Sequence, residues 1–192
     1  MKPHLLFLIL LGTSIISPTL ASEKPNFGEV GIAGNGCPEE ADAIRSSLIK
    51  FGADSVQIIP TQFTLSNQLS PKKLIRKKCD LALAVEVPNG YQVGMSNASS
   101  QSFLMLDDGS ESTVRVEAGF TGNKFEIEEL KAEGLVHQSI DLSNKTTQWA
   151  ECGEDAIIRM KVSATLKADE TQFSFVRINS FGLGIEYRAC SK

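Results

Sequence analysis

Apolar and polar residues alternate with a period of two over much of this chain. In Asp80–Val87 the residues Leu81, Leu83, Val85 and Val87 share one side, and small or polar residues occupy the other. Similar alternation or short apolar runs recur at Ser102–Leu106, Ser112–Phe120, Ala156–Leu166, Phe173–Ile178 and Leu183–Ala189. This period is typical of strands that bury one face. The pattern therefore predicts a mainly β protein.

Turn signals separate these segments. Pro88-Asn89-Gly90 lies between Asp80–Val87 and Tyr91–Met95, and two alternating runs around Asn-Gly predict a β-hairpin. Asp107-Asp108-Gly109 predicts a second turn. Val56–Leu65 is extended but contains Pro60, which predicts an edge or bulged strand.

Helix signals are few. Pro38–Ile49 could form a short helix, with proline and acids in its first turn, or Ile44–Ile49 could form a short strand. Glu126–Leu130 could supply one helical turn. Many short strands with regular turns favour an antiparallel β-sandwich, jelly-roll-like or Ig-like, with at most one or two short helices.

The N-terminus has the pattern of a secretory signal peptide. Lys2 precedes a compact apolar run, and Thr19 and Ala21 fit the −3 and −1 positions of a cleavage site after Ala21. An uncleaved membrane anchor is the alternative, but Gly12-Thr13-Ser14 interrupts the run before the ~20 apolar residues that a spanning helix needs. We expect a signal peptide at 1–21, one secreted or periplasmic domain at 22–192, and no stable membrane insertion.

Four cysteines, Cys37, Cys79, Cys152 and Cys190, lie beyond the predicted cleavage site. An even number in an oxidising compartment predicts two disulfides. Three connectivities are possible; we favour Cys37–Cys79 with Cys152–Cys190, and the nested pairing stays open. No C-x-x-C or H-x-x-x-H spacing occurs, so we expect no metal site and no cofactor.

The charge balance disfavours polyanionic partners. The formal net charge is −4, and loss of Lys2 with the leader makes it −5. Nucleic-acid binding requires a clustered basic surface, so we expect none, and we expect no attraction to anionic lipid. The basic run 72–78 is interpreted as a solvated loop or strand start flanking Cys79.

Catalytic signals are weak. His137, the only histidine after the leader, lies in a probable strand, and no G-x-S-x-G motif is present. A carboxylate-dependent hydrolase would need two acids across a cleft. Its candidates are Glu117, Glu126, Glu128, Glu129, Asp141 and Asp155. Asp107–Glu111 could ligate Ca²⁺ but lacks the usual loop spacing, so an acidic turn is favoured.

Trp149 is the single tryptophan. Beside Cys152 it is expected to pack on a disulfide at the sandwich core; exposed, it could form a sugar-stacking platform with Tyr91 or Tyr187. Asn97-Ala98-Ser99 and Asn144-Lys145-Thr146 are N-glycosylation sequons.

The sequences around the cysteines form an ordered set across nearly the whole chain beyond the leader. Its pieces are Gly34–Pro38, Lys77–Cys79 with the following strand, Pro88–Tyr91, Trp149–Gly153 and Tyr187–Cys190. In these pieces the chain resembles the uncharacterised secreted family called domain of unknown function 4360. The resemblance implies a secreted, disulfide-bonded, mostly β domain and implies no activity.

These observations favour a binding or structural module, and no catalytic residue is assigned. Its partner could be a glycan, an envelope component or a protein. The alternatives are a secreted hydrolase acting on glycans through carboxylates, and a secreted inhibitor or effector.

Overall fold

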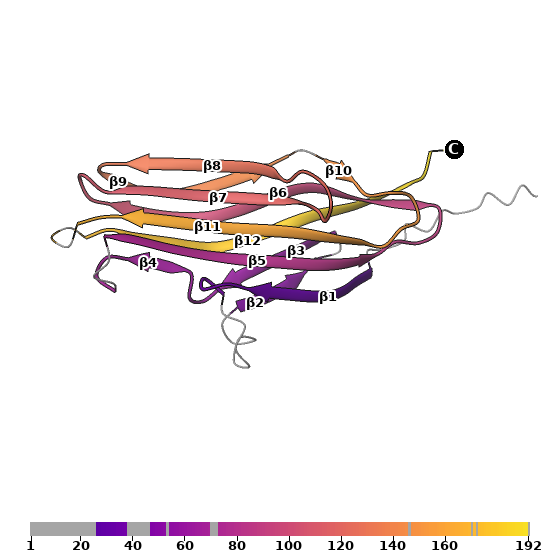
Figure 1. Cartoon of the computed structure of the whole chain (residues 1–192), viewed down its shortest axis with the longest axis horizontal. Coiled ribbons are helices and arrows are strands. Elements are labelled where there is room, and N and C mark those ends of the chain that lie inside the picture. Colours follow the sequence, from indigo (N-terminus) through magenta and orange to yellow (C-terminus); the bar gives the residue numbers. More distant parts are fainter. Residues whose placement is uncertain are drawn as a thin grey trace, which may run out of the picture.

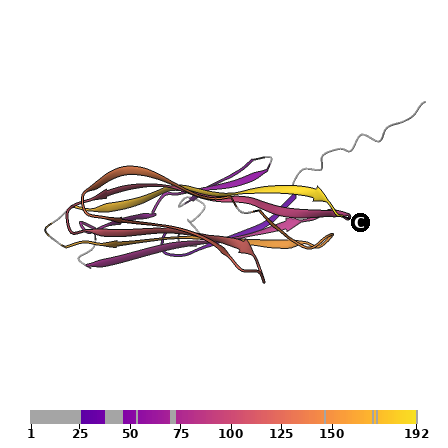
Figure 2. The ribbon, with the colours of Figure 1, turned by 90° about the horizontal axis from the view of Figure 1, so that it is seen from above.

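The computed structural model of the chain is a sandwich of two antiparallel β-sheets (Figures 1 and 2). The structure describes residues 26–37, 47–52, 54–69, 73–145, 147–169, 171 and 173–191. These residues contain twelve strands and no helix, so no described helix could cross a membrane. The predicted β-sandwich is confirmed, and the predicted signal peptide lies outside the described residues.

The first sheet, sheet A, has five strands. In spatial order they are β1 (Asn26–Ala33), β5 (Leu74–Glu86), β11 (Ala156–Lys167), β7 (Glu111–Phe120) and β8 (Glu126–Glu133). Every neighbouring pair is antiparallel. The long strands β5 and β11 form the centre of the sheet.

The second sheet, sheet B, has seven strands. Five follow the order β10 (Gln148–Trp149), β6 (Tyr91–Leu106), β12 (Phe175–Ala189), β3 (Ser55–Pro60) and β2 (Ser47–Phe51). In addition, β9 (Val136–Asn144) pairs with β6, and β4 (Thr64–Ser66) pairs with β12. The two longest strands, β6 and β12, form its centre.

The core lies between the sheets and is built from the alternating positions recognised in the sequence. Leu81, Leu83 and Val85 of β5 are at most 2% exposed. Burying each such side chain contributes about 1.5–3 kcal/mol. From sheet B, the fully buried large side chains include Ile58, Met95, Leu104, Leu106 and Phe181.

The predicted hairpin at Pro88–Gly90 is wrong, because β5 and β6 lie in different sheets. A turn does form, with the Tyr91 N–H donating to the Pro88 carbonyl at 3.0 Å. Gly90 has φ +82°, whereas none of the described residues other than glycine has a positive φ, so Asn89 does not. This is the φ pattern of a type II turn, whereas two-residue hairpins favour type I′ turns with positive φ at both central residues. The chain therefore crosses from one sheet to the other.

Other expectations also need correction. Glu126–Leu130 begins strand β8 and is not helical. Strand β6 spans both Tyr91–Met95 and Ser102–Leu106, which were predicted as separate strands, and β12 likewise joins most of Phe173–Ile178 to Leu183–Ala189. The pairing of β12 with β6 changes register at Asn179 and after Gly184. The turn at Asp107–Gly109 is confirmed, but it too links strands of different sheets.

Pro60 and the Pro38–Ile49 segment complete the comparison. Pro60 is the last residue of β3, which lies between β12 and β2, so the prediction of an edge strand is wrong. The ladder to β12 covers only Ser55–Ile58, so Pro60 interrupts no hydrogen bond there. Residues 47–49 belong to strand β2, in agreement with the strand alternative, and residues 38–46 lie outside the described residues.

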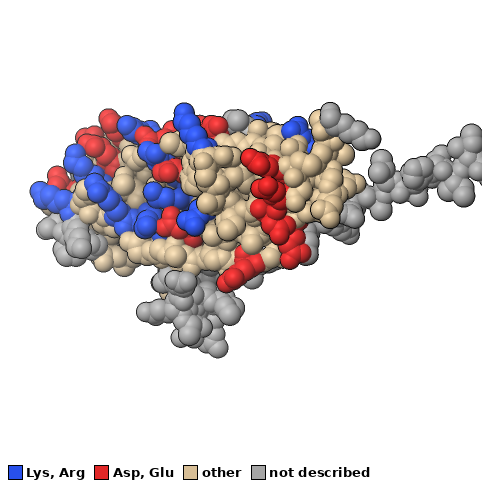
Figure 3. All heavy atoms as spheres, turned by 45° about the vertical axis from the view of Figure 1, so that its right-hand side comes forward, with Lys and Arg blue, Asp and Glu red and all other residues tan. Residues whose placement is uncertain are grey.

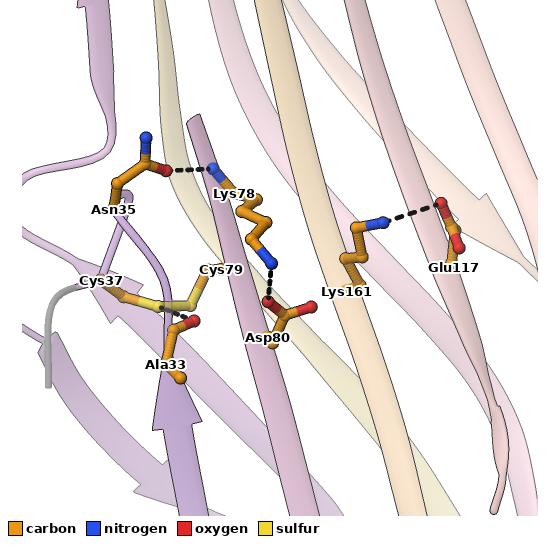
Figure 4. Close-up of polar contacts among 8 residues, drawn as sticks. All are labelled: Ala33, Asn35, Cys37, Lys78, Cys79, Asp80, Glu117 and Lys161. Carbon is orange, nitrogen blue, oxygen red and sulfur yellow. Dashed lines mark hydrogen bonds and ion pairs between the residues drawn. A yellow bond between two sulfur atoms is a disulfide. The ribbon is translucent and has the colours of Figure 1, made fainter. Parts of the chain in front are cut away.

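The favoured disulfide pairing is confirmed. Cys37 bonds Cys79 and Cys152 bonds Cys190, with Cα atoms 5.4 and 5.9 Å apart. Figure 4 shows the first disulfide beside Asn35, whose Oδ1 accepts the Lys78 N–H at 2.8 Å. Asn35 Nδ2 also donates to the Arg76 carbonyl at 3.0 Å, so its amide extends the β1–β5 pairing beyond the end of β1.

The second disulfide fastens the end of the sandwich where Figure 1 marks the C-terminus. Next to it, the Cys190 N–H donates to the Gly90 carbonyl and the Gly153 N–H donates to the Tyr91 carbonyl, each at 2.8 Å. The Tyr187 hydroxyl donates to the Glu86 carbonyl at 2.7 Å. These bonds join the turn between β5 and β6 to the two segments that carry the disulfide.

Candidate binding groove on the outer face of sheet B

The outer face of sheet B carries a row of small residues along its centre. On β12 these are Ser180, Gly182 and Gly184, which alternate with the buried Phe181, Leu183 and Ile185. Directly opposite them on β6 stand Gln101, Ser99 and Asn97. Because residues two apart in a strand share a face, these six positions form one continuous strip.

Larger polar residues border this strip on both sides. Strand β3 supplies Ser55 and Gln57, and β9 supplies Asp141 and Ser143 opposite Gln101 and Ser99. Together with the strip they line a hollow of about 400 Å³. A second hollow, lined by Asp54, Ser55, Ser96, Asn97, Lys145 and Gly184, shares three of these residues. We call the two together the sheet B groove.

Two glycines, Gly182 and Gly184, leave the floor of the groove without side chains at these positions. A Cβ atom on Gly182 would overlap the carbonyl oxygen of Val56, so the backbones of β12 and β3 approach closely there. A Cβ atom on Gly184 would overlap Asn97 Oδ1 and lie 2.6 Å from Ser96 Oγ. Glycine at these positions therefore lets the Val56 carbonyl and the Asn97 and Ser96 side chains approach the backbone of β12 closely.

A chain of hydrogen bonds crosses the floor. Gln57 Nε2 donates to Ser180 Oγ at 3.4 Å, and Ser180 Oγ donates to Gln101 Oε1 at 3.2 Å. These bonds link three strands and hold both glutamine side chains over the strip. The hollow is also lined by the amide nitrogen of Gln101, which can donate to a ligand, and by the exposed carboxylate of Asp141, which can accept.

The lining is suited to a ligand rich in hydroxyl groups. Serine, asparagine and glutamine each donate and accept hydrogen bonds, and a carboxylate accepts them, so together they match groups that both donate and accept. The only charged residue lining the first hollow is Asp141. The second adds Asp54 and Lys145. Hydroxyl and amide side chains thus predominate among the polar groups of the groove, and its net charge is small.

Aromatic side chains lie beyond one end of the groove on the same strands. Phe103 of β6 contacts Phe175 of β12, with ring centroids 5.5 Å apart, and the edge of His137 of β9 at 5.3 Å. Phe173 contacts Phe175 at 5.9 Å and is 47% exposed. His137 is an exposed strand residue, as expected, and lies beside this aromatic cluster.

Trp149 lies toward the other end of the same face. Strand β10 pairs with β6 so that Trp149 stands opposite Gly94, and a Cβ atom on Gly94 would lie 2.8 Å from Trp149 Cε3 and Cζ3. The indole therefore lies flat on the backbone of β6. The Arg188 guanidinium stacks over the ring, 3.8 Å from its centroid, and Arg188 Nε donates to Gln92 Oε1 at 2.9 Å.

The structure does not bring the three predicted stacking residues together. Tyr91 and Tyr187 pack against the core between the sheets, whereas Trp149 lies on the outer face and is not among the described core residues. The structure shows contacts of Trp149 with Gly94 and with Arg188. A platform of Trp149 with either tyrosine does not form.

The candidate acids of the hydrolase hypothesis do not share the groove: Glu117, Glu126, Glu128 and Glu129 lie on the neighbouring strands β7 and β8 of sheet A, where Arg115 pairs with both Glu117 and Glu129, and Asp141 and Asp155 lie apart from them. Glu117 and Glu129 form ion pairs on the outer face of sheet A, Glu126 accepts from Gln148, and Asp155 accepts the Val87 N–H. In the groove, Asp54 precedes β3 and Asp141 lies on β9. Their backbones are separated by three strand spacings, roughly 14 Å, beyond the ~5–9.5 Å that paired carboxylates need in glycosidases.

The outer face of sheet A has a different character. Ion pairs cover it, among them Lys78–Asp80, Lys161–Glu117 and Lys167–Glu111 at 3.0, 3.6 and 2.9 Å. Figure 4 shows two of these pairs, and Figure 3 shows basic and acidic side chains interspersed over one part of the surface, beside a band of acidic side chains alone. The described part of the basic run, residues 73–78, lies at the start of β5, as expected.

The groove was missed because its residues come from four strands that are distant in sequence. One local signal was available: in Ser180–Ile185 every second residue is serine or glycine, and the others are large and apolar. A strand with one face of small residues leaves a depression on that face. The sequon residue Asn97, noted only for glycosylation, lines the groove.

Comparison with known proteins places the chain among uncharacterised proteins. The family model described as "Domain of unknown function (DUF4360)" matches residues 23–189. No curated protein matches. A solved structure of TmCBM61 in complex with beta-1,4-galactotriose is 14% identical over 85% of this chain and 90% of that one, with a TM-score of 0.29. The enzymatically active domain of bacteriophage CBA120 tailspike protein 4 is 4% identical over 87% of this chain and 19% of that one, with a TM-score of 0.19.

Proposed function

The chain belongs to the DUF4360 family, and from this premise we propose that it is a secreted or periplasmic glycan-binding module whose binding site is the sheet B groove. The single observation that carries the proposal is the groove itself. It is a hollow of about 400 Å³ on a rigid sheet, lined by hydroxyl and amide side chains over a floor of glycine and serine. Sites that are built on strands hold their side chains in place better than sites on loops.

The chemistry of the lining favours a glycan over other ligands. A sugar ring presents several hydroxyl groups that both donate and accept hydrogen bonds, as Ser99, Gln101 and Gln57 do. Asp141 accepts hydrogen bonds from hydroxyl groups and disfavours anionic ligands. The groove has no cluster of cations for phosphate or nucleic acid among its described residues.

The extracytoplasmic location rests on two observations. Two disulfides are typical of proteins that fold in an oxidising compartment. The family match begins at residue 23, directly after the signal peptide of residues 1–21 that we propose to be cleaved after Ala21. N-terminal sequencing of the exported protein tests this, since it should begin at Ser22.

The experiment for the groove is calorimetry on residues 22–192 with the glycans that bind on an array. Gln101→Ala removes an amide from the floor, and Asp141→Ala removes the carboxylate at the wall. Each should weaken binding about ten-fold, because losing a hydrogen-bonding partner costs about 1–3 kcal/mol. Ser163→Ala, on the outer face of sheet A, is the matched control. Equal affinities for all three variants and the wild type, or no glycan bound, would refute the proposal.

A further inference from the structure

We infer that the ligand is a linear, uncharged oligosaccharide that lies along β6 and β12 and contacts aromatic side chains beyond both ends of the groove. This inference rests on the proposed function and names the shape of its ligand. The groove, the phenylalanine cluster and Trp149 all lie on the outer face of sheet B.

The direction of the chain follows from where the groove is bordered. Its sides are formed by β3 and β9, and its floor by β12 and β6, which run between them. A chain lying along β12 meets only Ser180, Gly182 and Gly184, whereas a chain lying across the strands would meet Gln57 and Asp141. The groove is therefore open in the direction of the strands.

Each end of this path reaches an aromatic surface. In one direction β6 leads from Gln101 to Phe103, and in the other from Asn97 to Gly94, on which Trp149 lies. From Gly94 to Phe103 is roughly 30 Å at the usual rise per strand residue. Aromatic rings offer flat apolar faces with a specific geometry, and the apolar C–H face of a sugar ring complements them. A short oligosaccharide fills the groove alone, whereas a longer one reaches both aromatic surfaces.

Arg188 covers the indole and has to move for a sugar to stack there. Its side chain is exposed, and its contact with the ring is of the cation–π type, which is weak at exposed sites. The arginine therefore holds the unliganded indole in place without preventing a ligand from replacing it.

Trp149 is the only tryptophan in the chain, so its fluorescence reports on this end of the site alone. The probes are cello-, laminari- and β-1,4-galacto-oligosaccharides, each from the disaccharide to the octasaccharide, titrated into residues 22–192. For a series that binds, short members should leave the emission unchanged. Members long enough to span the path should shift it and bind at least ten-fold tighter.

Variants distinguish glycan binding in the groove from the linear path that reaches the aromatic side chains. Gln101→Ala should weaken binding of short and long members alike, whereas Trp149→Ala, Phe103→Ala and the exposed Phe173→Ala should weaken only the long ones. Thermal unfolding confirms that each variant is folded. Arg188→Ala should bind the octasaccharide at least as tightly as the wild type.

Different outcomes would refute the proposed function and the linear path. If no series binds, or Gln101→Ala is silent, the proposed function fails. If affinity is independent of length, or the aromatic variants bind the octasaccharide as the wild type does, only the linear path fails. If Arg188→Ala loses as much affinity as Trp149→Ala, the contact belongs to the guanidinium and the stacking assignment is wrong.

Discussion

The side-chain oxygen of Asn97 lies directly above Gly184, in the space that a Cβ atom on residue 184 would occupy. The two residues face each other across β6 and β12 at the point where the two hollows of the groove meet. Gly182, two residues earlier, is also opposed by β6 but meets the backbone of β3 instead. The two glycines therefore have different consequences when replaced.

We expect Gly184→Ala to weaken glycan binding and leave stability nearly unchanged, because the Asn97 and Ser96 side chains can rotate away. Gly182→Ala should instead lower the free energy of unfolding by about 1–3 kcal/mol, since the carbonyl of Val56 cannot move without shifting β3. Urea unfolding and calorimetry on both variants measure the contrast. Equal losses of stability in the two variants would contradict the distinction between the backbone contact at Gly182 and the side-chain contacts at Gly184.

Asn35 is expected to stabilise the protein through its two hydrogen bonds to β5. Asn35→Ala removes both and should cost about 1–2 kcal/mol, since each intramolecular hydrogen bond contributes about 0.5–1.5 kcal/mol and this site is exposed. Asn35→Asp keeps the acceptor for the Lys78 N–H and loses the donor to Arg76, so its loss should be smaller. Denaturant unfolding of the three proteins gives the order, and a loss in Asn35→Asp as large as in Asn35→Ala would refute it.

The two disulfides should differ in their accessibility to reductants. Cys37 and Cys79 are 0% exposed, whereas Cys152 is exposed and Cys190 half-buried. Thiol–disulfide exchange requires access to a sulfur atom. Mild reduction of the folded protein should therefore open Cys152–Cys190 first. Alkylation followed by peptide mapping over time checks this; labelling of Cys37 and Cys79 before the other pair would be the contrary result.

A buried hydroxyl network closes the end of the sandwich opposite the second disulfide. Ser174 Oγ accepts the Asp107 N–H and donates to Ser110 Oγ, both at 2.9 Å, and both serines are 0% exposed. Ser174→Ala leaves a backbone N–H without this partner and should cost about 1–3 kcal/mol. Ser163→Ala, on the outer face of sheet A, should have little effect. Thermal unfolding compares the two variants, and similar midpoints would contradict a structural role for the network.

The sequence predicted strands such as β5, β7 and β11 well because each buries one face, and Leu81–Glu86 shows this alternation plainly, whereas β8 has one buried residue and gave no such signal. It failed at Pro88–Gly90 because a strand, a turn and a second strand have the same pattern whether they form a hairpin or cross between sheets. The difference lies in the pairing of β5 with β1 and β11 and of β6 with β9 and β12, which depends on segments distant in sequence. The disulfide pairing joined the cysteines nearest in sequence, as favoured.

The candidate site was less accessible to prediction. Its residues are brought together only by the order of β3, β12, β6 and β9, which pairing between distant strands determines. Trp149 was recognised as notable, but the residue beneath it, Gly94, has no side chain and gave no signal. The platform of Trp149 with Tyr91 or Tyr187 was a wrong prediction because the face of the sheet that each side chain occupies depends on the register of its strand.

The most direct test of the account is an amide ¹⁵N–¹H NMR titration of residues 22–192 with a glycan that binds on the array. If the sheet B groove binds the glycan, the shifted amides should cluster on the four strands of the groove, at Ser55–Gln57, Asn97–Gln101, Asp141–Ser143 and Ser180–Gly184. Shifts confined to the outer face of sheet A, or to the turns beside Cys152, would place the binding surface elsewhere and contradict it.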